Sequence, residues 1–578
     1  MKLRDRALVG ILSVALVLLS IAALGPSLQT AESAPEPTPG IVNTRHYIEG
    51  VIGRPSNASP FGARSAADRG LVALLFRGLV RLGPGSSITG DLASSWEVHD
   101  AGRTWTFHLR PRQYWEDGEP ITAEDVAFTV GVLSDPSYTG PGGESWTDVT
   151  ASVIDPLTVQ LQLTTPLGGF LEAATQPIAP VHLLGGIPPD QLADDPFGEK
   201  PIGSGPYHLV FLLTGRALLA ANAPVEALPE DPGGPNFSTP RPTDSLASAN
   251  ATIKPDVAIP YLTAFEIRYY DDVASLQAAW SKGDLDAAAG LPPGAATELA
   301  ATPGARLVTY PGATVLAISL NLRGDHPEFM DPAIRRALLQ AIDRDSLVSS
   351  MLVGLGSRAD SLIPPSSPMF DAEGNTPITF DPAAARKALE KAGWKQSGNS
   401  WIPKGGKDPL VIELLSPEEQ ANPVAYGTAD AIVDAWQAIG LAVRHVALPA
   451  TELIGDRLTR GQYQAAILPF AIGLDPDLYP LLAASQTRTG GSNVIGLQDP
   501  DLDTLLIAAR TPVDEAARIA AYKTLQARLE ARAYMLPLAF RDEYVVFRNT
   551  VVGPESRAVG TSGDRYWDVL TWRLADGT

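Results

Sequence analysis

The chain has 578 residues, of which 45% are apolar and 19% are charged, and its formal net charge is −21. A chain of this length is too long for a single hydrophobic core, so we expect two or three lobes. The excess of negative charge excludes the basic surface with which proteins bind nucleic acid, so nucleic acid is not an expected partner.

The first 40 residues are predicted to form an export signal or membrane anchor followed by a linker. A basic start (residues 1–6) precedes a run of 18 residues without a charge (7–24), and a Pro-rich segment follows (25–40). A run of about 18 apolar residues is at the lower limit for a helix that spans a bilayer. Because the chain contains no cysteine that could carry a lipid, an uncleaved helix is the simplest tether; cleavage near residues 31–34 is the alternative. We expect an extracytoplasmic protein, in the periplasm or on the outer face of the cell membrane.

The stretch WTFHLRPRQYWEDGEPITAEDV, residues 105–126, is dense in side chains that can perform chemistry. Over residues 105–109 apolar and polar side chains alternate, which is the period of a half-buried strand. Residues 116–120 are typical of a turn. Thr122, with Asp125 three residues later, predicts the N-terminal cap of a helix. The stretch is therefore interpreted as scaffold: a strand, a turn and a capped helix.

The alternative interpretation of this stretch is an acidic catalytic pair drawn from Glu116, Asp117 and Glu119, as in an exported hydrolase. The sequence contains no G-x-S-x-G elbow, no H-E-x-x-H helix and no Walker loop. None of its seven histidines stands two or four residues from another, and thiolate ligands are excluded because there is no cysteine. We therefore predict no catalytic residue, no metal and no cofactor.

Residues 223–260 are rich in Pro, Ala, Ser and Gly and poor in large apolar residues, which predicts a flexible insertion. Residues 261–270 then predict a strand, and residues 271–288 predict a helix. The second half is rich in predicted helices that begin at an N-cap residue followed by proline, as at Asp331 and Asp381. Further helices are predicted over 498–509 and 511–533, and a last strand over 534–549.

Five segments follow one another in an order that resembles the extracellular solute-binding proteins of family 5, the peptide- and nickel-binding class that serves ATP-driven importers. They are LVALLFRGLVRL, DLASSWEVHDAGRTWTFHLRPRQYWEDGEPITAEDVAFTV, PIGSGPYHL, RRALLQAID and FDPAAARKALEKAGW. The second segment is the most specific, and the others support it by their order. The resemblance runs from about Ile41 to Asn549.

The resemblance implies an α/β, bilobal periplasmic-binding-protein-like fold of the large class II type, with an extra subdomain inserted in lobe I. Two crossings between the lobes, near 306–315 and 536–545, would form a hinge. The implied parts are a signal or anchor with linker, 1–40; lobe I, 41–57, 200–310 and 536–578; its inserted subdomain, 58–199; lobe II, 311–535; and the flexible insertion, 223–260.

For function, the resemblance implies a monomer without enzymatic activity that captures an oligopeptide-like or other small solute between the lobes. The solute would then pass to the permease subunits of an ABC importer. A membrane-anchored solute sensor is the second hypothesis, because the same closure could signal to a membrane partner. The exported hydrolase with paired carboxylates is the third.

The resemblance also implies a set of ligand-binding residues. They come from an early loop, a loop of the subdomain and a segment of lobe II: Asn57, Ser59, Tyr138, Trp146, Phe470, Ile472 and Asp475. Peptide-binding members carry an Asp that pairs with the peptide α-ammonium, and Ile472 stands at that position here. Asp475 or Asp477 could substitute for it. Because a buried ammonium without a carboxylate is unfavourable, we expect a neutral or weakly charged solute, or a peptide bound without a contact to a free amine.

Overall fold

The computed structural model describes residues 46–85, 87–222, 260–398, 400–488 and 490–575. The predicted signal or anchor, 1–40, lies outside these residues, as does the predicted insertion, 223–260, apart from Pro260. Among the residues described, no helix combines the length and the apolar character needed to cross a membrane.

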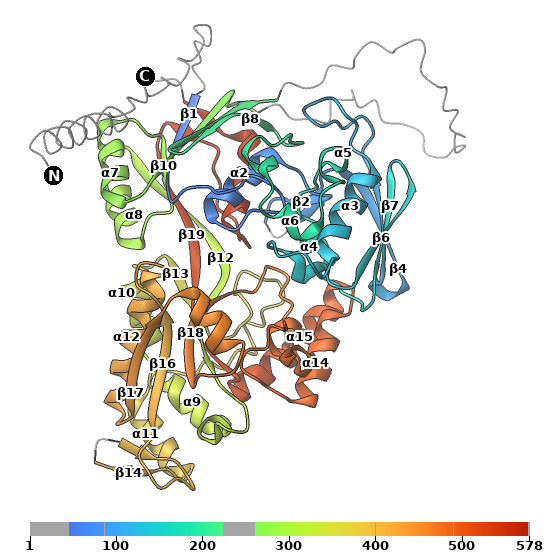
Figure 1. Ribbon diagram of the computed structural model, residues 1–578. Helices are drawn as coiled ribbons and strands as arrows, with labels where there is room; N and C mark the ends of the chain where they lie inside the picture. Colours follow the sequence, from blue (N-terminus) through green and yellow to red (C-terminus); the bar gives the residue numbers. More distant parts are fainter. Residues whose placement is uncertain (1–45, 86, 223–259, 399, 489, 576–578) are drawn as a thin grey trace, which may run out of the picture. The chain divides into compact units, whose positions relative to one another are not determined.

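One large mixed sheet, drawn in Figure 1, collects strands from distant parts of the described chain. Within the described ranges it has eleven strands, in the order β17-β16-β18-β12-β19-β11-β1-β10-β9-β8, with β13 paired to β19. The strands are β1 His46–Ile52, β8 Tyr207–Leu213, β9 Arg216–Ala221, β10 Ala264–Tyr270, β11 Ala287–Ala289, β12 Ala305–Leu320, β13 Gly356–Arg358, β16 Val411–Pro417, β17 Ala442–Leu448, β18 Ala465–Ala471 and β19 Met535–Arg548.

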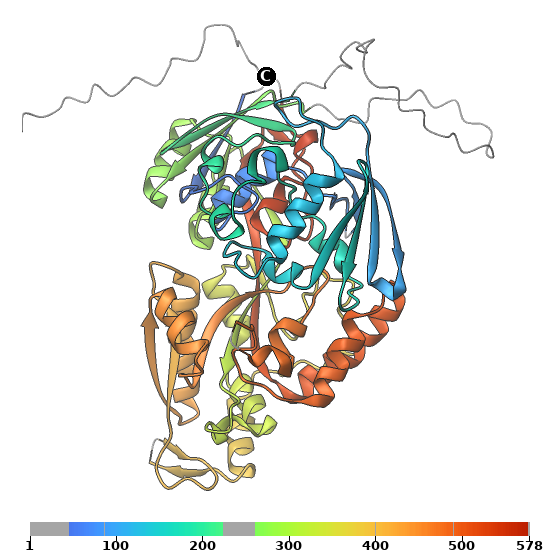
Figure 2. The same ribbon diagram turned by 45° about the vertical axis from the view of Figure 1, so that its right-hand side comes forward.

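The sheet passes through two lobes, each with its own hydrophobic core. The core of lobe I includes Tyr47 and Phe107, and the core of lobe II includes Trp436 and Ile467. The long strands β12 and β19 take part in both cores, and they run side by side from one lobe to the other in Figures 1 and 2. Their antiparallel register shifts between Tyr310 and Thr314, where the chain passes between the lobes. The predicted bilobal α/β fold is confirmed.

A four-stranded sheet, β4-β5-β7-β6, forms the inserted subdomain of lobe I. In β5, Thr104–Leu109, the alternating apolar side chains are buried as predicted. Thr122 and Asp125 form a capping box at the start of α3, Ala123–Ser134. The predicted strand, turn and capped helix are confirmed. The other strands of this sheet are β4 Ala93–His99, β6 Val149–Asp155 and β7 Thr158–Leu163.

The predicted N-caps in the second half are confirmed: Asp331 and Asp381 each accept a backbone N–H of their own helix at 2.8 Å. The helix predicted over 271–288 is shorter than expected, because Gly283, with φ 82°, ends it at Lys282 and the chain continues into β11. The helices are α2 Ala66–Leu75, α4 Phe170–Ala173, α5 Val181–Leu184, α6 Pro189–Leu192, α7 Val273–Lys282, α8 Pro293–Ala300, α9 Pro332–Gln340, α10 Arg344–Met351, α11 Pro382–Lys391, α12 Pro423–Ala438, α13 Tyr479–Leu482, α14 Pro500–Arg510 and α15 Glu515–Arg532.

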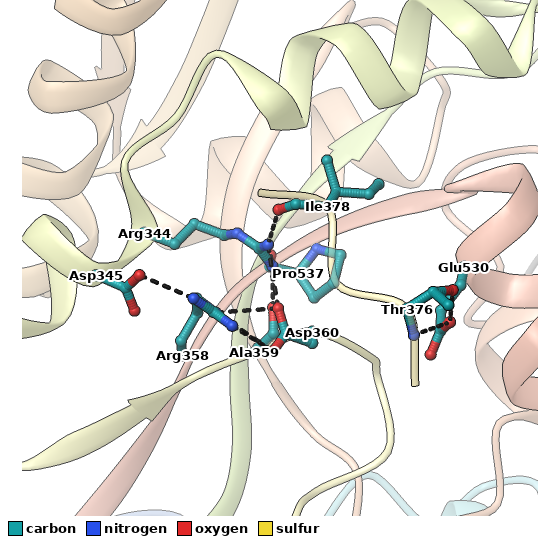
Figure 3. A network of polar contacts seen from close by, with 9 residues as sticks. All are labelled: Arg344, Asp345, Arg358, Ala359, Asp360, Thr376, Ile378, Glu530 and Pro537. Carbon is teal, nitrogen blue, oxygen red and sulfur yellow. Dashed lines mark hydrogen bonds and ion pairs between the residues drawn. The ribbon is translucent and has the colours of Figure 1, made fainter. Parts of the chain in front are cut away.

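Buried charge fastens the loop that follows β13 to the body of lobe II (Figure 3). Arg344, only 3% exposed, forms an ion pair with Asp360 at 3.1 Å and donates to the carbonyl groups of Ala359 and Ile378. Arg358 binds the same Asp360 carboxylate at 3.0 Å. The carboxylate therefore has two cations around it. The hydrogen bonds of Arg344 to Ala359 and Ile378 hold two parts of the loop, and a third, to Pro537, reaches β19.

We predict that Arg344→Met lowers the free energy of unfolding by about 2–4 kcal/mol, because it leaves two buried carbonyl groups without a donor and leaves Asp360 with only the partly exposed Arg358. Urea denaturation measures this loss. The matched control is Arg460→Met: its pair with Asp456 is exposed, so we expect a loss below about 1 kcal/mol. Equal losses in the two variants would contradict the role given to Arg344.

Gly312 lies at the register shift between β12 and β19, and a Cβ built there would be 2.0 Å from the carbonyl oxygen of Arg541. We predict that Gly312→Ala destabilises the protein by about 1–3 kcal/mol, because one of the two crossing strands must move. Thermal denaturation measures the effect. Gly324→Ala is the control, since nothing lies within 4 Å of its Cβ position. An unchanged melting temperature for Gly312→Ala would show that the strands tolerate a wider separation.

Candidate functional site

A cavity of about 1030 Å³ lies between the two lobes and has lining residues from both. Lobe I and its subdomain contribute Trp146, Glu172 and Asp564, and lobe II contributes the segment 470–477 and Arg518. This volume is at the upper end of the range of about 300–1,000 Å³ for small-molecule sites. The cavity is therefore large enough for an extended solute.

Four of the seven predicted ligand-binding residues line this cavity. Trp146 is 3% exposed and packs edge-on against Phe170, with ring centroids 5.4 Å apart. Phe470 lies in β18, and Ile472 follows it with its backbone N–H donated to the carbonyl of Ala313. Asp475 is the fourth. The structure thus brings one residue of the subdomain and three of lobe II to one cavity.

The other three predicted residues are absent from the described lining of the cavity. Asn57 donates to the carbonyl of Ala193 and accepts the N–H of Ser59, whose hydroxyl accepts the N–H of Phe61. The hydroxyl of Tyr138 donates to the carbonyl of Phe61 at 2.8 Å. Their polar groups thus hold the loop of residues 57–61 in its fold.

The two carboxylates that could replace the missing Asp are each paired with an arginine. Asp475 forms an ion pair with Arg518 at 2.7 Å, and Asp477 forms one with Arg510 at 2.9 Å. Burial raises the pKa of both carboxyl groups, and the arginines oppose that rise. Neither carboxylate therefore faces the cavity with an unbalanced charge.

Sequence reasoning missed both arginines. Arg518 has a sequence signal: it stands four residues before Tyr522 on the buried stripe of α15, where a charged residue predicts a buried partner. Its partner could not be identified, because Asp475 is 43 residues away in the chain. Arg510 ends α14, where a basic residue is also the usual complement of the helix dipole.

Glu172 in α4 is a third carboxylate in the cavity wall that the sequence did not indicate. Its oxygens accept the backbone N–H groups of Leu474 and Asp475, at 2.7 and 2.6 Å. Burial, opposed by these two hydrogen bonds, raises its pKa to about 7. Leu474 and Asp475 follow Glu172 by 302 and 303 residues in the chain, so this contact depends on how the two lobes are arranged.

The acidic turn considered as a catalytic pair lies away from the described cavity lining. Asp117 binds His182 at 2.8 Å, which lowers its pKa although burial opposes the shift. Glu116 donates its backbone N–H to the carbonyl of Gly203 at 3.1 Å. Glu119 is exposed and pairs its backbone carbonyl with the N–H of Trp115. The turn thus joins neighbouring segments of lobe I.

Among the described residues, no group of three or more His, Asp or Glu side chains could hold a metal ion.

Comparison with protein families gives one match over most of the chain. The model described as Bacterial extracellular solute-binding proteins, family 5 Middle, matches residues 87–492. Protein XP55 of Streptomyces lividans is 29% identical over 441 residues, which are 75% of this chain and 72% of that protein. Oligopeptide-binding protein AppA of Bacillus subtilis is 24% identical over 525 residues, 89% of each chain.

Solved structures have the same fold. AppA from Bacillus subtilis in complex with a nonapeptide has a TM-score of 0.71 at 21% identity, covering 92% of this chain and 99% of that one. NikZ from Campylobacter jejuni in complex with Ni(L-His) has a TM-score of 0.70 at 22% identity, covering 92% and 100%. Two proteins with different bound solutes thus share this architecture.

We predict that Arg518→Met lowers the free energy of unfolding by about 2–4 kcal/mol at pH 8 and by less at pH 5. At pH 8 Asp475 stays ionised without its cation, whereas at pH 5 a carboxyl with a raised pKa can take up a proton. Urea denaturation at the two pH values measures the difference. Arg64→Met, which breaks an exposed pair, is the control with a small loss at both pH values. A loss for Arg518→Met that is independent of pH would exclude Asp475 as the group left unpaired.

Proposed function

The chain belongs to the bacterial extracellular solute-binding proteins of family 5, and from this premise we propose that it captures a solute in the cavity between its lobes and passes it to the permease subunits of an ABC importer. The members of this family are extracytoplasmic solute-binding proteins, and solute binding needs no catalytic residue. The closed state must bind the solute more tightly than the open state does, because only a difference in affinity shifts the equilibrium between the two states.

The observation that carries the proposal is the cavity itself, which has its walls on both lobes. Phe470 and Ile472, both partly exposed, supply apolar surface on its walls, which suits the side chains or alkyl parts of a solute, and the buried Trp146 packs behind the wall against Phe170. Asp475 supports the wall through Arg518. Asn57, Ser59 and Tyr138 are proposed to act on the solute only indirectly, by shaping the loop of residues 57–61.

We further propose that the solute carries no free ammonium group at the lobe II segment. Ile472 stands where peptide-binding members have the carboxylate for that group, and the nearby Asp475 and Asp477 already hold arginines. A solute ammonium there would have to displace a guanidinium from its carboxylate. AppA is named as an oligopeptide-binding protein and its structure holds a nonapeptide, so we propose an oligopeptide bound through other contacts as the alternative to a neutral solute.

The division of the chain follows the same proposal. Lobe I consists of residues 41–57, 200–310 and 536–578, its inserted subdomain of 58–199, and lobe II of 311–535. We propose that the N-terminal segment, 1–40, acts as an export signal or as a membrane anchor. The protein acts as a monomer, because one chain supplies both walls of the cavity.

Mass spectrometry tests the solute class: the purified protein is denatured, and the small molecules that it releases are identified. We expect a neutral or weakly charged solute, or a peptide whose affinity does not change when its α-amine is acetylated. In Ile472→Asp, a free-amine peptide should raise the melting temperature more than its acetylated form does, because the variant restores a carboxylate. Ile454→Asp, at an exposed position of lobe II, is the matched control.

Recovery of ordinary di- to pentapeptides from the native protein, with binding lost on acetylation, would contradict the proposed solute class. It would leave the role in solute capture intact. Turnover of peptides or glycosides at catalytic rates would overturn that role as well.

A further inference from the structure

A contact separate from the two hinge strands joins the lobes across the cavity. Glu172 of the subdomain accepts the N–H groups of Leu474 and Asp475 in lobe II; these three residues are called the latch. Beside it, Gly168 donates its N–H to the carbonyl of Arg510 at 2.8 Å. Because the partners belong to different lobes, the latch must break when the lobes move apart about β12 and β19.

Two glycines allow this close approach. A Cβ at Gly168 would lie 1.8 Å from the carbonyl oxygen of Pro512, and a Cβ at Gly169 would lie 2.7 Å from Cγ of Asp475. Any side chain at either position would hold the subdomain away from lobe II, and the carboxylate of Glu172 could then not reach the two amides. The sequence PLGGFLEA, residues 166–173, therefore provides a surface fitted to lobe II.

Among the residues described, Glu172 forms no ion pair with a cation. The groups that act most strongly on its charge are the two amides of the latch, which favour the carboxylate, and the carboxylates of Asp475 and Asp564, which oppose it. Asp475 is held by Arg518 at 2.7 Å. Asp564, on the lobe I side, accepts the N–H groups of Gly560 and Thr561 at 2.9 and 2.7 Å, and Arg557 acts on its charge.

We propose that the lobes take up a proton at Glu172 when they close, so that solute capture is coupled to pH through the latch. A carboxylate that moves out of water to a place beside two other carboxylates is unfavourable when ionised. A protonated carboxyl keeps an oxygen that accepts an amide N–H, and it gains a hydroxyl that can donate to a neighbouring carboxylate. This inference rests on the proposed function, because it concerns the closure that captures the solute.

The direction of the pH effect follows from linkage. In the structure described, burial and like charge raise the pKa of Glu172 to about 7, and in the open state its exposure to water returns the pKa toward the ordinary value of 4.5. The closed state therefore binds the proton more tightly, and closure becomes more favourable as pH falls through 7. With these two values the equilibrium constant for closure rises about tenfold between pH 8 and pH 6.

Fluorescence energy transfer between the lobes tests the proposal without any solute. The chain has no cysteine, so Ser95→Cys in β4 and Ala508→Cys in α14, both exposed, place two dyes at unique sites on the full chain. We expect the closed population to be larger at pH 6 than at pH 8. In Glu172→Gln the response between these pH values should disappear, whereas in Glu124→Gln, an exposed carboxylate of the same subdomain, it should persist.

A closed population that does not depend on pH in the unmodified sequence, or a response that persists in Glu172→Gln, would overturn the proposal. If Glu172→Gln does not fold, as circular dichroism would show, Glu172→Asp replaces it. The shorter side chain keeps a titrating group but withdraws it from the two amides, which lower its pKa, and from the nearby carboxylates, which raise it. The pH at which the response occurs should therefore shift, and an unmoved response would also overturn the proposal. A protein that closes with pH in this way but binds no solute would refute the proposed function alone.

Discussion

The antiparallel pairing of β12 with β19 is the constraint on which both lobes depend. The same two strands place Val308 and Val545 in the core of lobe I and Ile318 and Phe540 in the core of lobe II. Each lobe folds around its own core, so neither can slide along the strands without breaking backbone hydrogen bonds and exposing apolar surface. Bending at the register shift breaks less, and this is the motion that the fold permits.

Three carboxylates of the cavity wall, Asp475, Asp477 and Glu172, each have a partner close by, although the chain as a whole is strongly acidic. In lobe II the balance comes from arginines of α14 and α15, which bind Asp477 and Asp475. For Glu172 it comes from two amides of the opposite lobe, which are weaker partners than a guanidinium. On the lobe II side, the described wall therefore combines apolar residues with carboxylates that arginines already hold.

The sequence predicted those features that short segments determine by themselves. Alternation over residues 105–109, the capping box of Thr122 and Asp125, and the cap at Asp331 are local, and the structure confirms them. The order of such segments resembled a family, and through it the bilobal fold was predicted. The ligand-binding residues implied by the family stay a prediction: the structure places Ile472 at the cavity, whereas Asn57 makes its hydrogen bonds within its own lobe.

What could not be predicted depends on contacts that form only when the two lobes are assembled. Glu172 is one acidic residue in a short helix, and its neighbours in sequence do not indicate that two amides 302 and 303 residues later will bind it. The hinge and the latch also differ in kind. The hinge is held mainly by backbone pairing and apolar burial, whereas the latch depends on hydrogen bonds to the carboxylate of Glu172. Because the stability of each lobe and the closing of the lobes rest on different interactions, each lobe can stay folded while the equilibrium between the open and closed states responds to pH.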